Sequence, residues 1–149
     1  MQINSDNSLD KKDINALIFM MEGLDEPWGM KDVASRHIYM NAAALIYTNT
    51  PPNFAIEGKL DAEFPVSWSE LHEALKQHDL LTQNSARRVA VIETHCWNGA
   101  SSMSPYISEK TPIYDKHKQC IGIMWKADST PKCNAKPPFL TLQIPPRVV

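Results

Sequence analysis

The stretch SRHIYMNAAALIY, from Ser35 to Tyr47, changes its hydrophobic period within a few residues. His37 to Met40 alternates like a short strand, whereas the alanine-rich run after Asn41 favours a helix. An Asn side chain accepts a hydrogen bond from a backbone N–H of the first helical turn, so a helix can begin directly at Asn41. The stretch therefore predicts a strand that turns at once into a capped helix.

The residues before this corner predict a second strand and a helix. PWGMKD, residues 27–32, reads as a strand, and VASRH forms the turn of a hairpin with the strand HIYM. Further upstream, residues 9–24 place apolar side chains at helical spacing, and Gly23 is a suitable stop.

The residues after the corner predict short helices, one long helix and three strands. Prolines in TNTPPN end the helix that starts at Asn41, and residues 54–65 predict a loop or a short helix with 3₁₀ character. A helix over 67–83 has Ser67 as its expected N-cap, with Glu70 completing a capping box. Strands are predicted over 87–97, 103–115 and 119–127, and the prolines of 103–115 indicate an edge strand or a bulge.

This order of elements predicts an α+β fold with one five-stranded antiparallel sheet and helices on one face. A long crossover must then bring the first two strands beside the last three. We divide the chain into an N-terminal tail and dimerisation helix (1–23), a domain (24–128) and a Pro-rich linker (129–149) with a short extended piece at 139–142.

Composition excludes several classes of protein. The chain has 149 residues and a net charge of −2, so it carries no basic footprint for nucleic acid. Its 3 cysteines form no CxxC pair, and its histidines are scattered, so we predict no disulfide framework and no metal site. No apolar run approaches the roughly 20 residues of a membrane span. We expect a cytoplasmic protein, and the sequence identifies no cofactor.

Two segments carry a resemblance to a known family. PWGMKDVASRHIYMNAAA resembles the opening hairpin of a PAS domain, and VIETHCWNGASSMSPYISEKTPIYDKHKQCIGIMWKA resembles its closing three-stranded meander. The resemblance covers about residues 24–128. More narrowly, the chain resembles the N-terminal sensory domain of bacterial PAS/LuxR-type helix-turn-helix transcriptional regulators. This implies a pocket between sheet and helices, a homodimer, and DNA contact only through a C-terminal segment absent from this chain.

An enzyme is the alternative from a different class. Glu93, His95 and Cys96 offer an acid, a base and a nucleophile, but neighbours on a strand point to opposite faces. No GxSxG, HExxH or P-loop pattern occurs. We therefore predict no catalytic activity, and the alternative is a small α+β enzyme that uses Glu93 or His95 as an acid–base group.

A small-molecule pocket would be lined by apolar and aromatic side chains that face the helices. The expected inward positions are Trp28, Met30, Tyr39, Leu45, Ile46, Leu71, Leu75, Ile92, Tyr106 and Met124. The same residues would equally fill a solid core, which leaves a ligand-free interaction domain as a further alternative.

The N-terminal helix is more apolar than a free surface helix. Leu17, Ile18, Phe19 and Met21, together with Met20, predict a dimer interface, with the outer face of the sheet as its partner. The alternative is a monomer in which the helix folds back onto its own sheet. The favoured function is a sensory and dimerisation module in which a small molecule shifts the packing of this helix.

Overall fold

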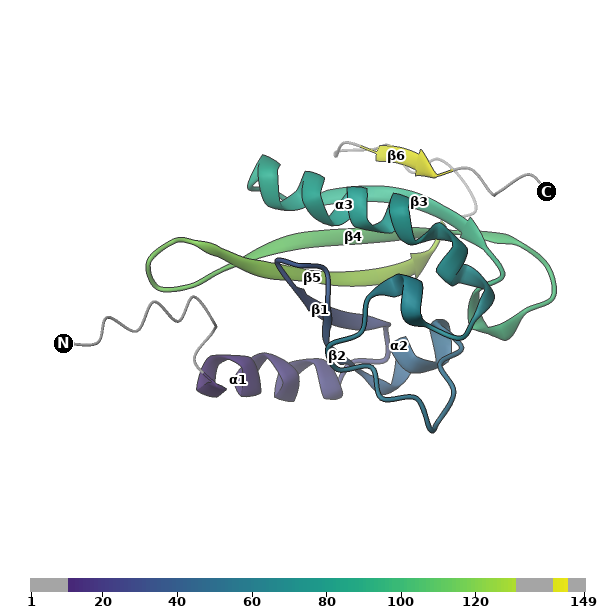
Figure 1. The fold of residues 1–149 in the computed structure, drawn as a ribbon, viewed down its shortest axis with the longest axis horizontal. Coiled ribbons are helices and arrows are strands. Elements are labelled where there is room, and N and C mark those ends of the chain that lie inside the picture. Colours follow the sequence, from purple (N-terminus) through teal and green to yellow (C-terminus); the bar gives the residue numbers. More distant parts are fainter. Residues whose placement is uncertain (1–10, 131–140, 145–149) are drawn as a thin grey trace.

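The computed structural model describes residues 11–130 and 141–144, and one twisted sheet organises them (Figure 1). The strand order is β2-β1-β5-β4-β3-β6. The first five of these strands pair antiparallel, as predicted, and β1 lies beside β5 through the expected crossover. Their bounds are β1 Trp28–Asp32, β2 His37–Met40, β3 Val89–His95, β4 Ser104–Tyr114 and β5 Cys120–Ser129.

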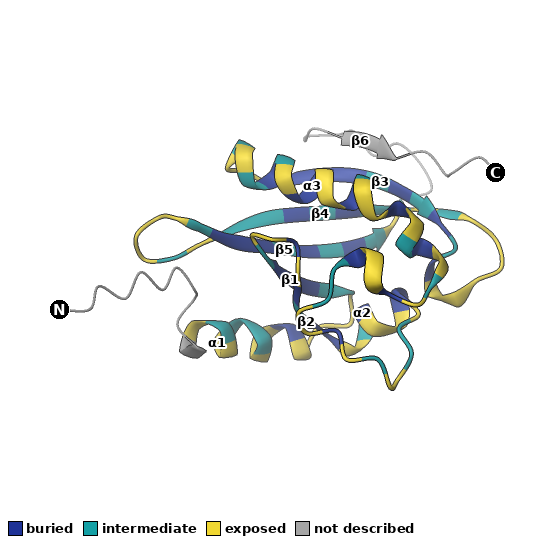
Figure 2. Cartoon of the chain, in the orientation of Figure 1, coloured by how far each residue is buried: buried dark blue, intermediate teal, exposed yellow. Residues whose placement is uncertain are grey.

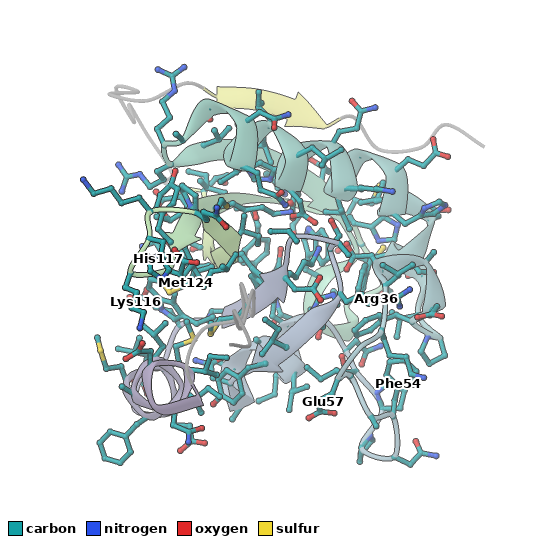
Figure 3. The ribbon with its side chains drawn as sticks, turned by 60° about the vertical axis from the view of Figure 1, so that its left-hand side comes forward. Arg36, Phe54, Glu57, Lys116, His117 and Met124 are labelled. Atoms are coloured by element: carbon teal, nitrogen blue, oxygen red, sulfur yellow. The ribbon has the colours of Figure 1, made fainter. Side chains whose placement is uncertain are left out.

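Helices complete the α+β architecture. Two α-helices and two 3₁₀ turns lie between β2 and β3: α2 (Ala42–Tyr47), η1 (Asp61–Glu63), η2 (Ser67–Leu71) and α3 (His72–Ser85). A third turn, η3 (Trp97–Gly99), links β3 to β4. Figures 1 and 3 place α3 and the N-terminal helix α1 (Lys11–Glu22) at opposite edges of the molecule. No helix among the described residues is long and apolar enough to cross a membrane.

Asn41 caps α2, which confirms the prediction from the quoted stretch. Its Oδ1 accepts from the N–H of Ala44 at 2.8 Å and from the N–H of Trp28 at 3.1 Å. Its Nδ2 donates to the carbonyl oxygens of Met21 at 3.0 Å and Glu26 at 2.9 Å. This one buried side chain therefore joins the end of α1, the start of β1 and the start of α2.

The predicted capping box of the long helix is wrong. The segment begins with the 3₁₀ turn η2, whose N-cap is Val66 and has no side-chain cap, and α3 starts only at His72. Glu70 instead lies 2.7 Å from Nε2 of His95, which belongs to β3. A contact from a distant strand has replaced the local cap that spacing alone favoured.

The strand predicted to be an edge or a bulged strand, β4, is a central strand, and the extra residue at its register shift is Ile121 of β5. The register between β4 and β5 shifts at Ile113/Tyr114, while β4 itself lies between β5 and β3. Pro105 and Pro112 lie near the two ends of this 11-residue strand. A proline removes only its own N–H, and successive N–H groups of an antiparallel strand point to alternate neighbours, so a central strand loses few ladder bonds.

A further strand, β6 (Thr141–Ile144), joins the sheet from the predicted linker 129–149. It pairs parallel to β3, with Val91 opposite Leu142 and Glu93 opposite Ile144. Of the extended piece expected at 139–142, residues 139 and 140 lie outside the described residues. The remaining pairing gives the sheet a sixth strand that the antiparallel prediction did not include.

α1 buries one stripe and exposes another (Figure 2). Met21 is buried, and Ile14, Leu17 and Ile18 are half-buried. Phe19 remains 80% exposed and Met20 67% exposed. The helix thus packs on its own domain and still presents apolar surface.

A candidate ligand pocket

A pocket lies between the inner face of the sheet and the helical layer. It encloses about 380 Å³, part of which is open solvent. Both aromatic and charged side chains line it: Lys31, His37, Met40, Tyr47, Thr48, Asp61, Trp68, Leu75, Glu93, Trp97, Ser108, Lys110 and Trp125.

Aromatic rings form much of the wall. Tyr47 of α2 stacks on Trp97 of η3 with ring centroids 4.8 Å apart and an interplanar angle of 18°. Trp68 of η2 lies 6.3 Å from Trp97, and its Nε1 donates to the carbonyl oxygen of Thr48 at 2.7 Å. Because α2, η2 and η3 each contribute a ring, the shape of this wall depends on the tertiary packing of all three segments.

Glycine lets two strands approach each other beneath this wall. Gly29 of β1 pairs with Trp125 of β5, and the indole ring of Trp125 occupies the space that a Cβ of Gly29 would need. Gly122 of β5 lies so close to the carbonyl oxygen of Lys31 that a Cβ has no room.

A buried network of charges forms the floor of the pocket. Lys31 Nζ of β1 lies 2.6 Å from Asp61 Oδ2 and 3.1 Å from Asp79 Oδ2. Lys110 Nζ of β4 lies 2.5 Å from Asp79 Oδ1 and donates to the carbonyl oxygen of Leu75 at 3.1 Å. His37 Nε2 lies 2.6 Å from Asp61 Oδ1. Two lysines and two aspartates balance each other, and they join β1 and β4 to η1 and α3.

Burial and pairing shift the pKa values of this network in opposite directions. Burial lowers the pKa of Lys31, but the carboxylates of Asp61 and Asp79 outweigh it and raise the pKa overall. Burial raises the pKa of both aspartates, but the lysine charges outweigh it and lower them. The pKa of His37 is lowered, chiefly by burial. Lys31, Asp61 and Asp79 are therefore ionised at neutral pH beside a neutral His37.

Four polar groups of the pocket lining have no hydrogen-bond partner among the described residues. They are Nδ1 of His37, the hydroxyl of Tyr47, Oε1 of Glu93 and Nε1 of Trp125. Burial, followed by the negative charge of Glu93, raises the pKa of Tyr47 well above its usual value, so its phenol keeps the proton. Buried polar groups are normally paired, and each unpaired group carries a free-energy cost. The pocket thus presents unpaired hydrogen-bond donors and acceptors to a polar ligand.

Glu93 and His95 share the inner face of β3, as the alternation of the strand predicted, but each has a different neighbour. His95 Nε2 lies 2.7 Å from Oε1 of Glu70. Glu93 Oε1 lies 3.9 Å from Nδ1 of His78 on α3. Cys96 follows the end of β3 and does not line the pocket.

Most residues expected to line the pocket lie elsewhere, and of the predicted set only Leu75 lines it. Lys31, Met40, Glu93 and Trp125 point into the pocket, so the residues adjacent to them in the strands point to the other face. Those neighbours are Met30, Tyr39, Ile92 and Met124, and Trp28 lies two positions before Met30 on the same face of β1. Figure 3 shows Met124 on one side of the strands and Phe54, which packs against the core, on the other.

The remaining predicted residues belong to helices or to the rim of the core. Leu71 is buried in the core, and Tyr106 packs against it, with its ring centroid 5.1 Å from that of Tyr47. Leu45 and Ile46 are exposed on α2, because Ala44 and Tyr47 are the buried residues of that helix.

Of the charged residues that line the pocket, sequence reasoning singled out only Glu93, as an acid–base group of the alternative enzyme, and it missed the lysines and Asp61. Lys31 and Lys110 occupy strands, and Asp79 lies in the middle of a helix, where a charged residue normally faces solvent. A lysine within a short apolar strand such as WGMKD is the signal that was available. Its meaning depended on knowing which face of the strand is inside.

Proteins of known structure share this architecture. No protein-family model matches the chain, and no curated protein matches its sequence. Solved structures do match: the phage VqmA–DPO complex has a TM-score of 0.72 at 22% identity and covers 80% of this chain and 54% of that one. A Vibrio cholerae VqmA dimer, described as a LuxR-type receptor, has a TM-score of 0.68 at 20% identity, with coverages of 86% and 60%. The chain thus spans less than two thirds of the VqmA chains.

A structure of an isolated domain matches over nearly its full length. The PAS domain of Bordetella pertussis BvgS has a TM-score of 0.64 at 15% identity and covers 82% of this chain and 89% of that one. The chain has the fold of a PAS domain.

Proposed function

We propose that this chain is the sensory and dimerisation PAS module of a bacterial transcriptional regulator. It binds a small molecule in the pocket and thereby controls a DNA-binding segment located C-terminal to it. The PAS domain comprises residues 24–128, residues 1–23 contribute the dimerisation helix, and residues 129–149 form the connection to the effector. We further propose that the module works in the cytoplasm and has no catalytic activity of its own.

The observation that carries this proposal is the set of unpaired polar groups around an aromatic-walled pocket. Tyr47, Glu93 and Trp125 are buried, and each has a polar atom without a hydrogen-bond partner. A bound molecule would supply the missing partners. The similar VqmA structures include complexes with DPO and a complex with ligand and DNA. A ligand-responsive regulator is therefore the function that the pocket and its structural neighbours support best.

Hydrogen bonds connect the strand β1, which lines the pocket, to the N-terminal helix α1. Lys31 of β1 lines the pocket, and Asn41 binds both the N–H of Trp28 in β1 and the carbonyl oxygen of Met21 in α1. A molecule that displaces Lys31 would move β1 against α1. β3 offers a second route, from the pocket to β6, because Glu93 of β3 lines the pocket and pairs with Ile144 of β6.

Dimerisation is the second part of the proposal. Phe19 and Met20 are exposed on α1 beside the half-buried Leu17 and Ile18. A contiguous apolar stripe of this kind marks an interface. LuxR-type effectors read two half-sites, and a homodimer presents two copies at a fixed distance.

Native mass spectrometry of gently purified protein, followed by denaturation and identification of any released compound, tests the proposal. We expect a dimer that carries one small molecule per protomer. A dimer that stays empty after incubation with extracts of cultured bacteria would overturn the ligand-sensing part. A monomer at micromolar concentration would overturn the dimerisation part.

A further inference from the structure

The environment of Glu93 contains an acceptor without a donor. Glu93 is only 4% exposed, it lines the pocket, and its Oε1 has no hydrogen-bond partner among the described residues. Nδ1 of His78 lies 3.9 Å from this Oε1, which is too long for a hydrogen bond.

His78 does not supply the missing proton. Its Nε2 lies 2.8 Å from the carbonyl oxygen of Val89, and since a carbonyl only accepts, the ring proton must be on Nε2. Burial, reinforced by the charge of Lys110, lowers the pKa of His78 and keeps the imidazole neutral. The lone pair of Nδ1, itself without a partner, then faces the carboxylate. Two acceptors lie near each other with no proton between them.

The lysines of the pocket do not supply it either. Lys31 is bound to Asp61 and Asp79, and Lys110 is bound to Asp79 and to the carbonyl oxygen of Leu75. Their two positive charges are balanced by the two aspartates. Oε1 of Glu93 therefore remains an acceptor without a donor among the described residues, and a buried polar atom without a partner is costly.

The walls beside Glu93 are aromatic. Tyr47, Trp68, Trp97 and Trp125 all line the pocket, and indole and phenol faces attract cations and stack on flat rings. We infer that Glu93 is the specificity-determining acceptor of the pocket and that the ligand is a small, flat nitrogen compound, of the amidine or amide class, that donates an N–H to it. This inference rests on the proposed sensory function and narrows the class of molecule sensed.

Four probes with one ring and different polar groups test the inference on the full chain: benzamidine, benzamide, benzoate and toluene. Binding is measured by isothermal titration calorimetry and by the shift of the thermal midpoint. We expect benzamidine and benzamide to bind about tenfold or more tightly than benzoate and toluene, because only the first two offer an N–H to the carboxylate. Equal binding of benzoate and benzamide would overturn the inference.

Glu93→Gln provides the second measurement, with Glu109→Gln as the matched control. Glu109 is on the neighbouring strand and lies with Lys126 and Arg88, outside the pocket lining. We expect E93Q to weaken benzamidine binding about tenfold or more and E109Q to leave it unchanged. Unchanged affinity in a folded E93Q protein would overturn the assignment of Glu93, and if E93Q fails to fold, the four probes on the unmodified chain still decide.

The two proposals fail in different ways. If no probe binds but a compound co-purifies, its structure decides: a compound without an N–H overturns the inference about Glu93 and leaves the sensory function standing. If no probe binds and no compound co-purifies, both proposals are overturned. If the probes bind without discrimination, the pocket binds small molecules, and only the role of Glu93 is lost.

Discussion

Asn41 Nδ2 donates to the carbonyl oxygen of Met21 at 3.0 Å and thereby fixes the end of α1 to the corner between β2 and α2. The same amide caps α2 through its Oδ1. One side chain thus holds an element expected to mediate dimerisation against the strand pair that carries Lys31 and His37 of the pocket.

Replacing Asn41 separates these roles. We expect Asn41→Ala to lower the free energy of unfolding by about 2–4 kcal/mol, because it removes the cap and leaves buried carbonyl and N–H groups unpaired. Asn41→Asp keeps the capping oxygen but loses the donors, so its loss should be smaller. Urea unfolding followed by circular dichroism measures both. Asn53→Ala, at an exposed turn, is the control, and an N41A protein as stable as this control would contradict the expectation.

Truncating the buried ion network should be strongly destabilising. Asp79→Ala leaves Lys31 and Lys110 without one of their two balancing charges, and we expect a loss of about 3–5 kcal/mol. Lys76→Ala on the exposed face of the same helix should change stability by less than about 0.5 kcal/mol. Equilibrium unfolding in guanidinium chloride compares the two variants, and equal stabilities would show that the network contributes nothing net.

Stability should fall in two stages as the pH decreases. His37 and His78 have lowered pKa values in the folded state, chiefly through burial, so below about pH 6.5 the unfolded chain binds more protons than the folded one. The stability that they contribute is present above that pH and is lost as the pH falls toward 5. Asp61 and Asp79 also have lowered pKa values, so a second loss follows below about pH 4.

Urea unfolding at intervals from pH 8 to pH 3 measures this profile. His37→Gln should flatten the first stage, whereas His72→Gln should leave it unchanged, because His72 is exposed at the start of α3. A free energy of unfolding that stays constant between pH 7 and pH 5.5 would be inconsistent with two buried neutral histidines.

The exposed stripe of α1 can be tested without disturbing the core. We expect Phe19→Ser combined with Met20→Ser to weaken the dimer by about tenfold or more, since both side chains are largely exposed in the single chain and would be buried only against a partner. Sedimentation equilibrium measures the dissociation constant. Leu80→Ser, an exposed apolar position on α3, is the matched control. An unchanged constant in the double variant would remove α1 from the interface.

Local rules in the sequence determined the elements and their order. The change of period at Asn41, the strand alternation and the prolines after α2 each act within a few residues, so the hairpin, the cap and the final meander were all predicted. The order of these elements then predicted the five-stranded antiparallel sheet with its crossover. The capping box predicted at Ser67 is wrong, because the carboxyl group of Glu70 contacts His95 of β3 instead.

Only the tertiary structure decided which face of each strand lines the pocket. The alternation along a strand shows that neighbouring side chains point to opposite faces, but not which face is inside. A shift of one residue in the register reverses every assignment. The register shift at Met30/Lys31 pairs Lys31 with His37. Asp61 and Asp79, which are 30 and 48 residues from Lys31 in the chain, then neutralise its charge. A buried lysine is favourable only when such partners surround it, and no local pattern records where those partners will be.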